Sequence, residues 1–138
     1  MSKYETIEHT ADTGVRAFGG TVEEAFCNAA AGMFSIISDP AKVQGKERFE
    51  ISVEAEDRET LLVEWLNELL YLYDSRGMLM SRFEIDYMSE TSLRGAAWGE
   101  PIDPARHDLR TDIKAVTYHM LKVERRPEGW VAEVIFDV

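Results

Sequence analysis

The chain has 138 residues, of which 45% are hydrophobic and 30% are charged, a balance typical of a globular domain rather than a disordered segment. This length predicts a single domain, residues 1–138, with a sizeable core. Acidic residues outnumber basic residues by 26 to 15, and the resulting net charge of −11 disfavours direct binding to the phosphate backbone of RNA or DNA. The same charge suits a cation, a basic protein partner or a well-solvated surface.

A single cysteine, Cys27, excludes an internal disulfide and a four-thiolate zinc site. No apolar run approaches the roughly 20 residues that a membrane span requires. The first residues, Met-Ser-Lys-Tyr-Glu, are not followed by an apolar signal segment. We therefore expect a cytoplasmic protein without a membrane partner.

The N-terminal segment contains two short runs typical of strands, residues 4–7 and 15–18, on either side of residues 9–14. In this connecting segment, Asp12 and a following glycine are ordinary turn residues. A histidine and an aspartate three residues apart can also provide a loop with a metal ligand. On spacing alone, the turn is the favoured interpretation.

A helix is predicted to begin after Thr21, because Thr21 and Glu24 form a capping-box pattern. Its apolar face repeats at helical spacing and consists of Val22, Phe26, Ala29, Met33 and Ile37. Pro40 ends it, since proline disfavours helix in the residue before it. Cys27 lies beside this face and is interpreted as a packing residue, because nothing nearby would lower the pKa of its thiol.

Strict alternation over residues 48–55 predicts a strand with one solvated face. A second helix is predicted over about residues 59–75, where leucines, Trp65 and Tyr73 form a broad apolar stripe. Gly77 is a natural helix end. Such a stripe is more typical of a core-facing helix than of a partner-binding surface.

Beyond Gly77 the pattern is almost wholly that of β structure. Phe83, Ile85 and Tyr87 alternate and are predicted to share a face, and a turn then leads into a strand over residues 92–98. Residues 99–109 contain two prolines and form the one long irregular loop.

Residues 112–125 are strand-like, but the phase of their apolar residues changes. A bulge near Thr117 would explain the change, and the alternative is two strand segments with a bend. A turn at residues 126–129 precedes a final strand. Its alternate residues Trp130, Ala132, Val134 and Phe136 are predicted to share one face.

Two amphipathic helices and seven or eight strands, mostly joined by hairpins, predict an α+β fold. Its expected form is a two-layer sandwich in which the helices pack on a largely antiparallel β-sheet.

Four blocks of the sequence resemble the archease family: His-Thr-Ala-Asp-Thr-Gly at 9–14, the helical segment 63–71, Ile-Lys-Ala-Val-Thr-Tyr-His at 113–119, and the ending Val-Ile-Phe-Asp-Val at 134–138. The blocks occur in the family's order and extend over almost the whole chain. The resemblance implies the same two-layer α+β architecture.

The resemblance also implies a metal site formed by Asp12 and the last two residues, Asp137 and Val138. Carboxylate oxygens, including a terminal carboxylate at Val138, suit a hard divalent cation, with Ca²⁺ favoured over Mg²⁺ or Mn²⁺. These groups can meet only if the first and last strands are neighbours. Zinc is disfavoured, because the histidines lack HExxH or similar spacing and Cys27 offers the only thiolate.

Three further residues are candidates for supporting the metal or contacting a partner. His9 would orient the Asp12 loop through a hydrogen bond, and His119 either does the same or faces solvent. Lys114 lies in a block that contains a lysine in the archease family. It balances the charge of the carboxylates, touches a phosphate, or is simply a solvated lysine.

The sequence contains no nucleophile elbow, cysteine–histidine signature or phosphate-binding loop. The family resemblance implies an accessory protein, not an enzyme, that activates the tRNA-splicing RNA ligase. It would promote guanylylation and multiple turnover of the ligase and broaden its nucleotide use, without binding RNA itself. The alternatives are a small metal-dependent hydrolase, with His9 or His119 as base, and a chaperone-like binding module.

Overall fold

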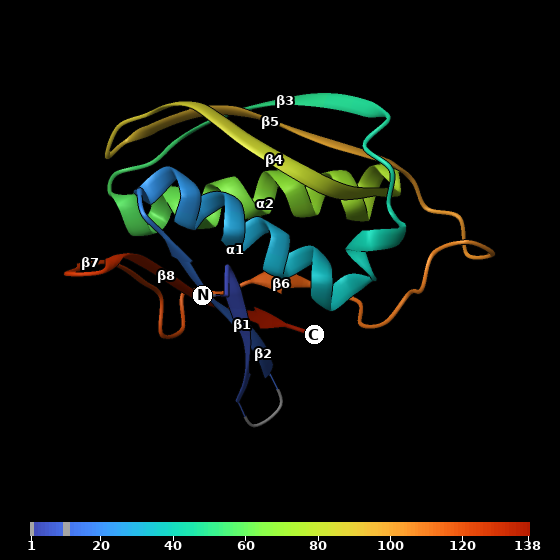
Figure 1. Cartoon of the computed structure of the whole chain (residues 1–138), viewed down its shortest axis with the longest axis horizontal. Coiled ribbons are helices and arrows are strands. Elements are labelled where there is room, and N and C mark those ends of the chain that lie inside the picture. The colour runs from blue at the N-terminus through green and yellow to red at the C-terminus, as the bar shows by residue number, and fades with distance from the viewer. Residues whose placement is uncertain (1, 10–11) are drawn as a thin grey trace.

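The structure is a computed structural model that describes residues 2–9 and 12–138 (Figure 1). Its elements in chain order are β1 (Tyr4–His9), β2 (Asp12–Gly19), α1 (Val22–Ile37), the 3₁₀ turn η1 (Pro40–Lys42), β3 (Glu47–Glu54), α2 (Arg58–Arg76), β4 (Met78–Met88), β5 (Ser92–Pro101), β6 (Ala115–Val116), β7 (Lys122–Arg126) and β8 (Gly129–Asp137).

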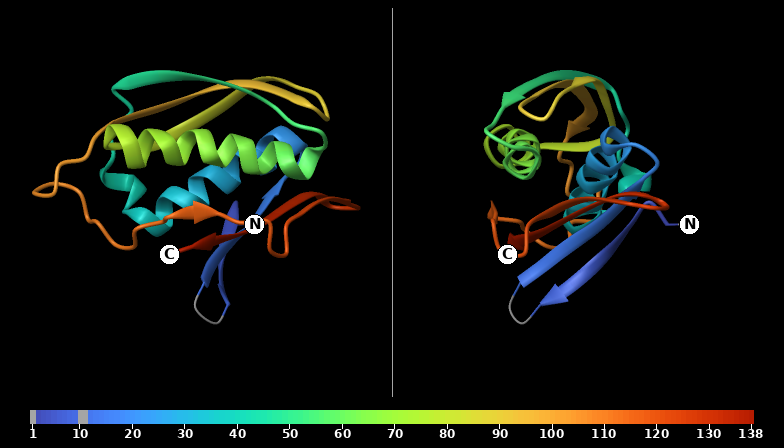
Figure 2. Two further views of the ribbon diagram at one scale, coloured as in Figure 1. Left: turned by 180° about the vertical axis from the view of Figure 1, so that it is seen from behind. Right: turned by 90° about the vertical axis from the view of Figure 1, so that its left-hand side faces the viewer.

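The strands form two antiparallel sheets. One has the order β3-β5-β4, and the other has the order β1-β2-β8-β6, with β7 also pairing with β8. Both helices lie between the two sheets (Figures 1 and 2): α1 contacts β2, β8 and β4, whereas α2 contacts β3, β4 and β6. The predicted α+β class with helices packed on antiparallel sheet is confirmed, and the helices are covered on both sides.

The helix α1 begins as its sequence predicts. The Thr21 hydroxyl oxygen accepts a hydrogen bond from the Glu24 amide at 3.1 Å, and the Glu24 carboxylate accepts one from the Gly20 amide at 3.1 Å. The capping box is therefore present, with Glu24 reaching one residue beyond Thr21. Cys27 is half-buried on this helix, and burial raises the pKa of its thiol to about 12, which supports its interpretation as an unreactive packing residue.

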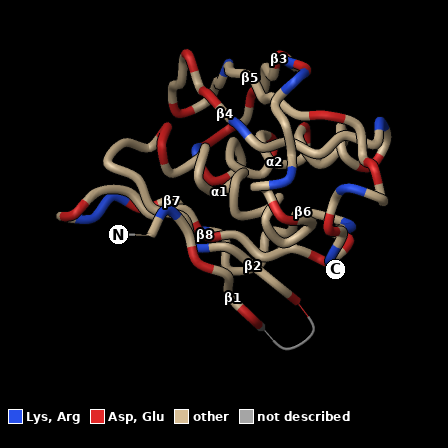
Figure 3. The backbone as a smooth tube through the Cα atoms, turned by 45° about the vertical axis from the view of Figure 1, so that its right-hand side comes forward, with Lys and Arg blue, Asp and Glu red and all other residues tan. Residues whose placement is uncertain are grey.

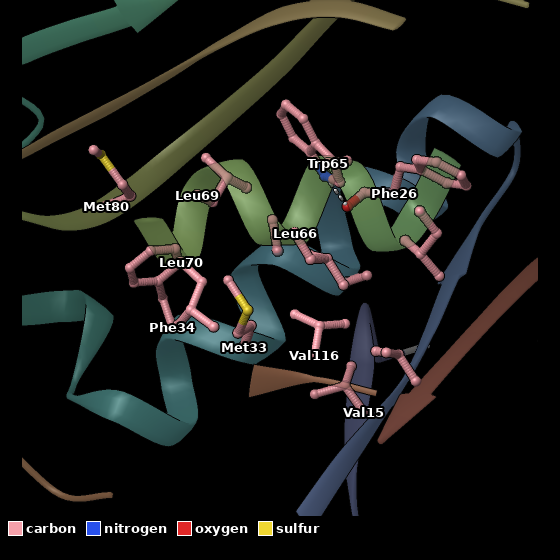
Figure 4. Packing of buried hydrophobic residues seen from close by; sticks show 14 of the residues in the cluster. Val15, Phe26, Met33, Phe34, Trp65, Leu66, Leu69, Leu70, Met80 and Val116 are labelled. Atoms are coloured by element: carbon pink, nitrogen blue, oxygen red, sulfur yellow. Dashed lines mark hydrogen bonds between the residues drawn. The ribbon is translucent and has the colours of Figure 1, made fainter. Parts of the chain in front are cut away.

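The helix α2 matches its predicted span closely. The Asp57 carboxylate caps its first turn by accepting a hydrogen bond from the Thr60 amide at 2.8 Å. Gly77 ends it in the left-handed conformation, with φ of +64°. The apolar stripe is buried, as predicted, and the indole N–H of Trp65 donates a hydrogen bond to the Phe26 carbonyl of α1 at 3.0 Å (Figure 4).

Strand β4 departs from the prediction that Phe83, Ile85 and Tyr87 share a face. The register of β4 against β5 shifts between Ile85 and Tyr87. Because one inserted residue reverses the alternation, Tyr87 pairs with Arg94 and is 45% exposed, with the Arg94 guanidinium 4.7 Å from its ring centre. The prediction is wrong for Tyr87, since sequence alternation alone does not mark this bulge.

Residues 112–125 follow the second of the two predicted alternatives. Only residues 115–116 and the start of β7 are strand, and a turn over residues 117–121 separates them. Within this turn, Met120 has φ of +55°. The phase change in the apolar pattern therefore reflects a bend between two short strands, not a bulge at Thr117.

The Trp65–Phe26 hydrogen bond yields a stability prediction. Replacing Trp65 with phenylalanine removes the indole donor and part of the buried ring, so we expect the free energy of unfolding to fall by about 1–3 kcal/mol. Urea denaturation followed by far-ultraviolet circular dichroism measures this change. Trp98→Phe is the matched control because Trp98 is only half-buried, and equal unfolding midpoints for the two variants would contradict the proposed tie between helices.

Candidate functional site

Strand β8 brings the beginning and the end of the chain together. It lies between β2 and β6, and its last registered pair with β2 joins Thr13 to Phe136. Asp12 and Asp137 are the next residues along the two strands. Since alternate residues of a strand point to opposite faces, both aspartates lie on the outer face of the sheet, opposite the core residue Phe136.

Asp12 and Asp137 each pair with a further strand on their other side, β1 and β6 respectively. His9 pairs with Asp12 across the first hairpin, and Ala115 pairs with Asp137. The predicted role of the His9 side chain lies outside the described part of the chain. The amide of Lys114 donates a hydrogen bond to the Asp137 carbonyl at 2.8 Å, so the backbones of these two residues are adjacent, and the Lys114 side chain is exposed.

The remaining predicted residues lie close to this end of β8. Val138 is half-buried and packs against the main core, while its carboxylate as a metal ligand stays a prediction. The His119 amide donates to the Thr117 hydroxyl oxygen at 3.2 Å, and that hydroxyl donates to the Ile135 carbonyl at 2.8 Å. His119 is thus tied, through Thr117, to a point two residues before Asp137.

The oxygen donors of this region fit a hard cation better than zinc. Among the residues that the structure describes, no three His, Cys, Asp or Glu side chains form a group that could hold a metal. A cation held by Asp12 and Asp137 would therefore need additional oxygen ligands from the backbone, a terminal carboxylate or water. Ca²⁺ and Mg²⁺ accept such mixed oxygen ligands, whereas zinc requires nitrogen or sulfur ligands that are not grouped here.

Acidic side chains further along the same face form ion pairs, whereas Asp12 and Asp137 form none with the described residues. Arg16, four residues after Asp12 on β2, forms ion pairs with Glu5 and with the buried Glu133, both at 2.7 Å. Within residues 2–9 and 12–138, no ion pair involves Asp12 or Asp137. Although acidic residues are spread over both sheets and the loops (Figure 3), this end of β8 thus carries two carboxylates without a paired cation.

A second cluster of ionisable side chains, which the sequence did not reveal, lies at the end of β5 and in the long loop that follows it. Glu100 and His107 are only 2% and 5% exposed. The Glu100 carboxylate accepts hydrogen bonds from the Gln44 amide at 2.7 Å, from His107 Nε2 at 3.0 Å and from the Arg106 guanidinium. These bonds, with Arg106 the largest contributor, lower the pKa of Glu100 from 4.5 to about 2.

This cluster has the composition of a catalytic acid–base pair, but its atoms are already engaged. His107 Nδ1 accepts a hydrogen bond from the Asp103 amide at 2.9 Å, so Nε2 carries the proton that it donates to Glu100 and the ring is neutral. A buried histidine with both nitrogens bonded has no site for a substrate proton. We conclude that the cluster fixes the loop that leads into β6, which no local sequence pattern could have indicated.

None of the helices within residues 2–9 and 12–138 has the length and apolar character needed to cross a lipid bilayer.

Comparison with known proteins gives consistent matches over the full chain. The model of the Archease protein family (MTH1598/TM1083) matches residues 4–138. The archeases of Sulfurisphaera tokodaii and Pyrococcus furiosus are each 42% identical to this chain, with 100% of both chains covered. The solution structure of Methanobacterium thermoautotrophicum protein 1598 is 35% identical and covers 100% of both chains with a TM-score of 0.83.

A crystal structure from Thermotoga maritima, described as an archease and possible chaperone, is more distant. It is 25% identical, covers 97% of this chain and 96% of that chain, and has a TM-score of 0.64.

The Glu100 cluster predicts how stability depends on pH. Because folding lowers the pKa of Glu100 from 4.5 to about 2, its contribution is complete above pH 4.5 and is lost as the pH falls towards 2. Glu100→Gln should therefore lower the free energy of unfolding at pH 7 by about 1–3 kcal/mol, with the difference from wild type shrinking below pH 4.5. Urea denaturation at several pH values measures this.

Asp108→Asn provides the control, because the ion pair between Asp108 and Arg110 is exposed and should contribute little. A loss that is the same for Glu100→Gln at pH 7 and at pH 2.5 would show that the carboxylate charge does not matter.

Proposed function

The chain belongs to the archease family, and from this premise we propose that it is an accessory protein that activates a tRNA-splicing RNA ligase. In this proposal it promotes guanylylation of the ligase, allows each ligase molecule to turn over many times, and broadens the choice of nucleotide. The protein performs no chemistry of its own and does not bind RNA directly.

The acidic pair Asp12–Asp137 is the observation that carries the proposal. The two carboxylates lie at neighbouring positions on the outer face of one sheet, at its end, and no described basic side chain forms an ion pair with them. A ligase that uses GTP and a divalent metal has a basic, metal-binding active site. Carboxylates at the end of these two strands complement such a site electrostatically and speed the encounter of the two proteins.

The pair also explains which cofactor the proposal includes. Asp12 and Asp137, with Val138 as the third predicted ligand, would hold a divalent cation, for which Ca²⁺ is favoured over Mg²⁺ or Mn²⁺. When bound, the cation supplies positive charge that can be shared with nucleotide phosphates or ligase carboxylates. Lys114, whose backbone adjoins Asp137, would then lie close enough to the partner to contribute a donor.

The hydrolase alternative has less support. The buried His107 is fully engaged with Glu100 and Asp103, so it is not available as a base. The Thermotoga maritima protein is described as a possible chaperone, and a chaperone-like role would require protection of unrelated aggregating proteins. An aggregation assay with such clients, run beside the ligation assay, distinguishes this role from specific activation.

The first functional prediction concerns turnover. With ligase far below the concentration of RNA ends, addition of this protein should convert a single round of ligation into many rounds and increase the fraction of guanylylated ligase. Product per ligase molecule and the guanylylated fraction are the two measurements. If neither changes with ligase, GTP and metal from a matched source, the proposed function is wrong.

The second functional prediction concerns the cation. Asp12→Asn and Asp137→Asn each remove one anionic ligand, so we expect Ca²⁺ affinity in calorimetry to fall by about tenfold or more, and activation of the ligase to fall in parallel. The fold should be retained because Asp137 is exposed. Asp86→Asn is the matched control, since Asp86 is exposed on the other sheet, and an equal effect of all three variants would argue against a specific site.

A further inference from the structure

The turn over residues 117–121 exposes two large apolar side chains. Tyr118 is 61% exposed and Met120 is 49% exposed. Within the part of the chain that the structure describes, the other exposed large hydrophobic residues, Tyr71, Tyr87 and Leu109, each stand alone on a different segment. Isolated residues of this kind are ordinary on protein surfaces, whereas two on one five-residue turn form a local apolar patch.

The backbone of this turn is fixed in an uncommon conformation. Among the residues that the structure describes, Met120 is the only non-glycine residue with positive φ, at +55°, which bulky side chains rarely adopt. The turn is nevertheless held firmly at its base. The amide and the hydroxyl of Thr117 both donate to the Ile135 carbonyl, at 3.0 and 2.8 Å, and the hydroxyl oxygen accepts from the His119 amide.

These bonds place the patch beside the acidic pair. Thr117 is attached to β8 two residues before Asp137, and the Lys114 amide is attached to Asp137 itself. In Figures 1 and 2, the loop between β6 and β7, the C-terminal end and the β1–β2 hairpin all lie on the side of the molecule away from the three-stranded sheet. The exposed turn is thus bonded to β8 two residues from Asp137.

We propose that Tyr118 and Met120 are the apolar anchors through which this protein docks on its ligase; the inference rests on the proposed function. The partner surface that fits them is an apolar pocket with a basic rim, because Asp137, which forms no described ion pair, lies two residues from the β8 position to which Thr117 is bonded. Tyrosine contributes a large contact area at low entropic cost, and methionine adapts to an irregular pocket. A backbone already held in its bound conformation loses little entropy on association.

Other exposed aromatic residues do not meet these conditions. The Tyr87 ring is covered by the Arg94 guanidinium at 4.7 Å, and it lies on the other sheet. Tyr71 is 57% exposed on α2 but has no second exposed large apolar residue on its element among those described. Tyr71 therefore provides a control of nearly the same exposure as Tyr118.

The test measures binding of the full-length chain to its ligase by calorimetry or surface plasmon resonance. Tyr118→Ser and Met120→Gly should each weaken binding by about tenfold or more, and Tyr71→Ser should bind as wild type does. Met120→Gly accepts positive φ, so its melting temperature should not fall below that of wild type. Ca²⁺ affinity should stay unchanged in all three variants, because no metal ligand is altered.

The outcomes separate the anchor proposal from the proposed function. Weakened binding with unchanged Ca²⁺ affinity and melting temperature supports the anchors. If wild type binds and activates the ligase but Tyr118→Ser and Met120→Gly do so equally well, the anchors are wrong and the activator function stands. If wild type itself neither binds nor activates, the proposed function fails and the anchor proposal fails with it.

Discussion

The hydrogen-bond register of β8 is the constraint on which the candidate site depends. This C-terminal strand forms hydrogen-bonded ladders with β2, near the start of the chain, and with β6 and β7, which precede it in the sequence. Asp12 is set beside Asp137 by the pairing of Thr13 with Phe136, and Thr117 is set by its bonds to Ile135. A shift of one residue in this register would move every side chain of β8 to the opposite face, which would bury Asp137 and expose Phe136.

The acidic residues differ in burial and in whether a basic side chain pairs with them. The buried Glu100 and Glu133 each have an arginine partner, as a carboxylate removed from water requires. Exposed pairs such as Arg126 with Glu124 contribute little to stability. The acids at the end of β8 belong to neither group, because they are held at a defined position by the sheet and lack a described partner. A net charge of −11 therefore does not by itself locate the site.

Sequence reasoning succeeded where the determining contacts are local. The cap at Thr21, the stop at Gly77 and the apolar stripe around Trp65 all arise within one or two helical turns, and each is confirmed. It failed or was silent where contacts are distant in sequence. The bulge that turns Tyr87 outward depends on its pairing with β5, and the Glu100 cluster requires the Gln44 amide, 56 residues away.

The candidate site itself was only partly predictable for the same reason. Asp12 and Asp137 were named from a family resemblance, and their neighbouring positions follow from the register of two strands at opposite ends of the chain. For the docking turn, a bend between two strand segments was one of two predicted alternatives, but the backbone conformation and exposed side chains of the turn were not predicted. Its sequence, Thr-Tyr-His-Met-Leu, has ordinary strand composition, and the left-handed backbone at Met120 is not favoured by any glycine or asparagine there.

A rigid surface suits an accessory protein with the proposed function. A protein that does no chemistry can change the rate of an enzyme only by binding one state of that enzyme more tightly than another, and a hundredfold preference requires about 2.8 kcal/mol of differential binding. A surface that had to order itself on contact would lose part of this difference to conformational entropy. The turn at residues 117–121 avoids that loss because Thr117 fastens it to β8, the strand that also positions Asp137. Both parts of the proposed contact surface therefore depend on a single strand, and their relative positions are fixed before the partner arrives.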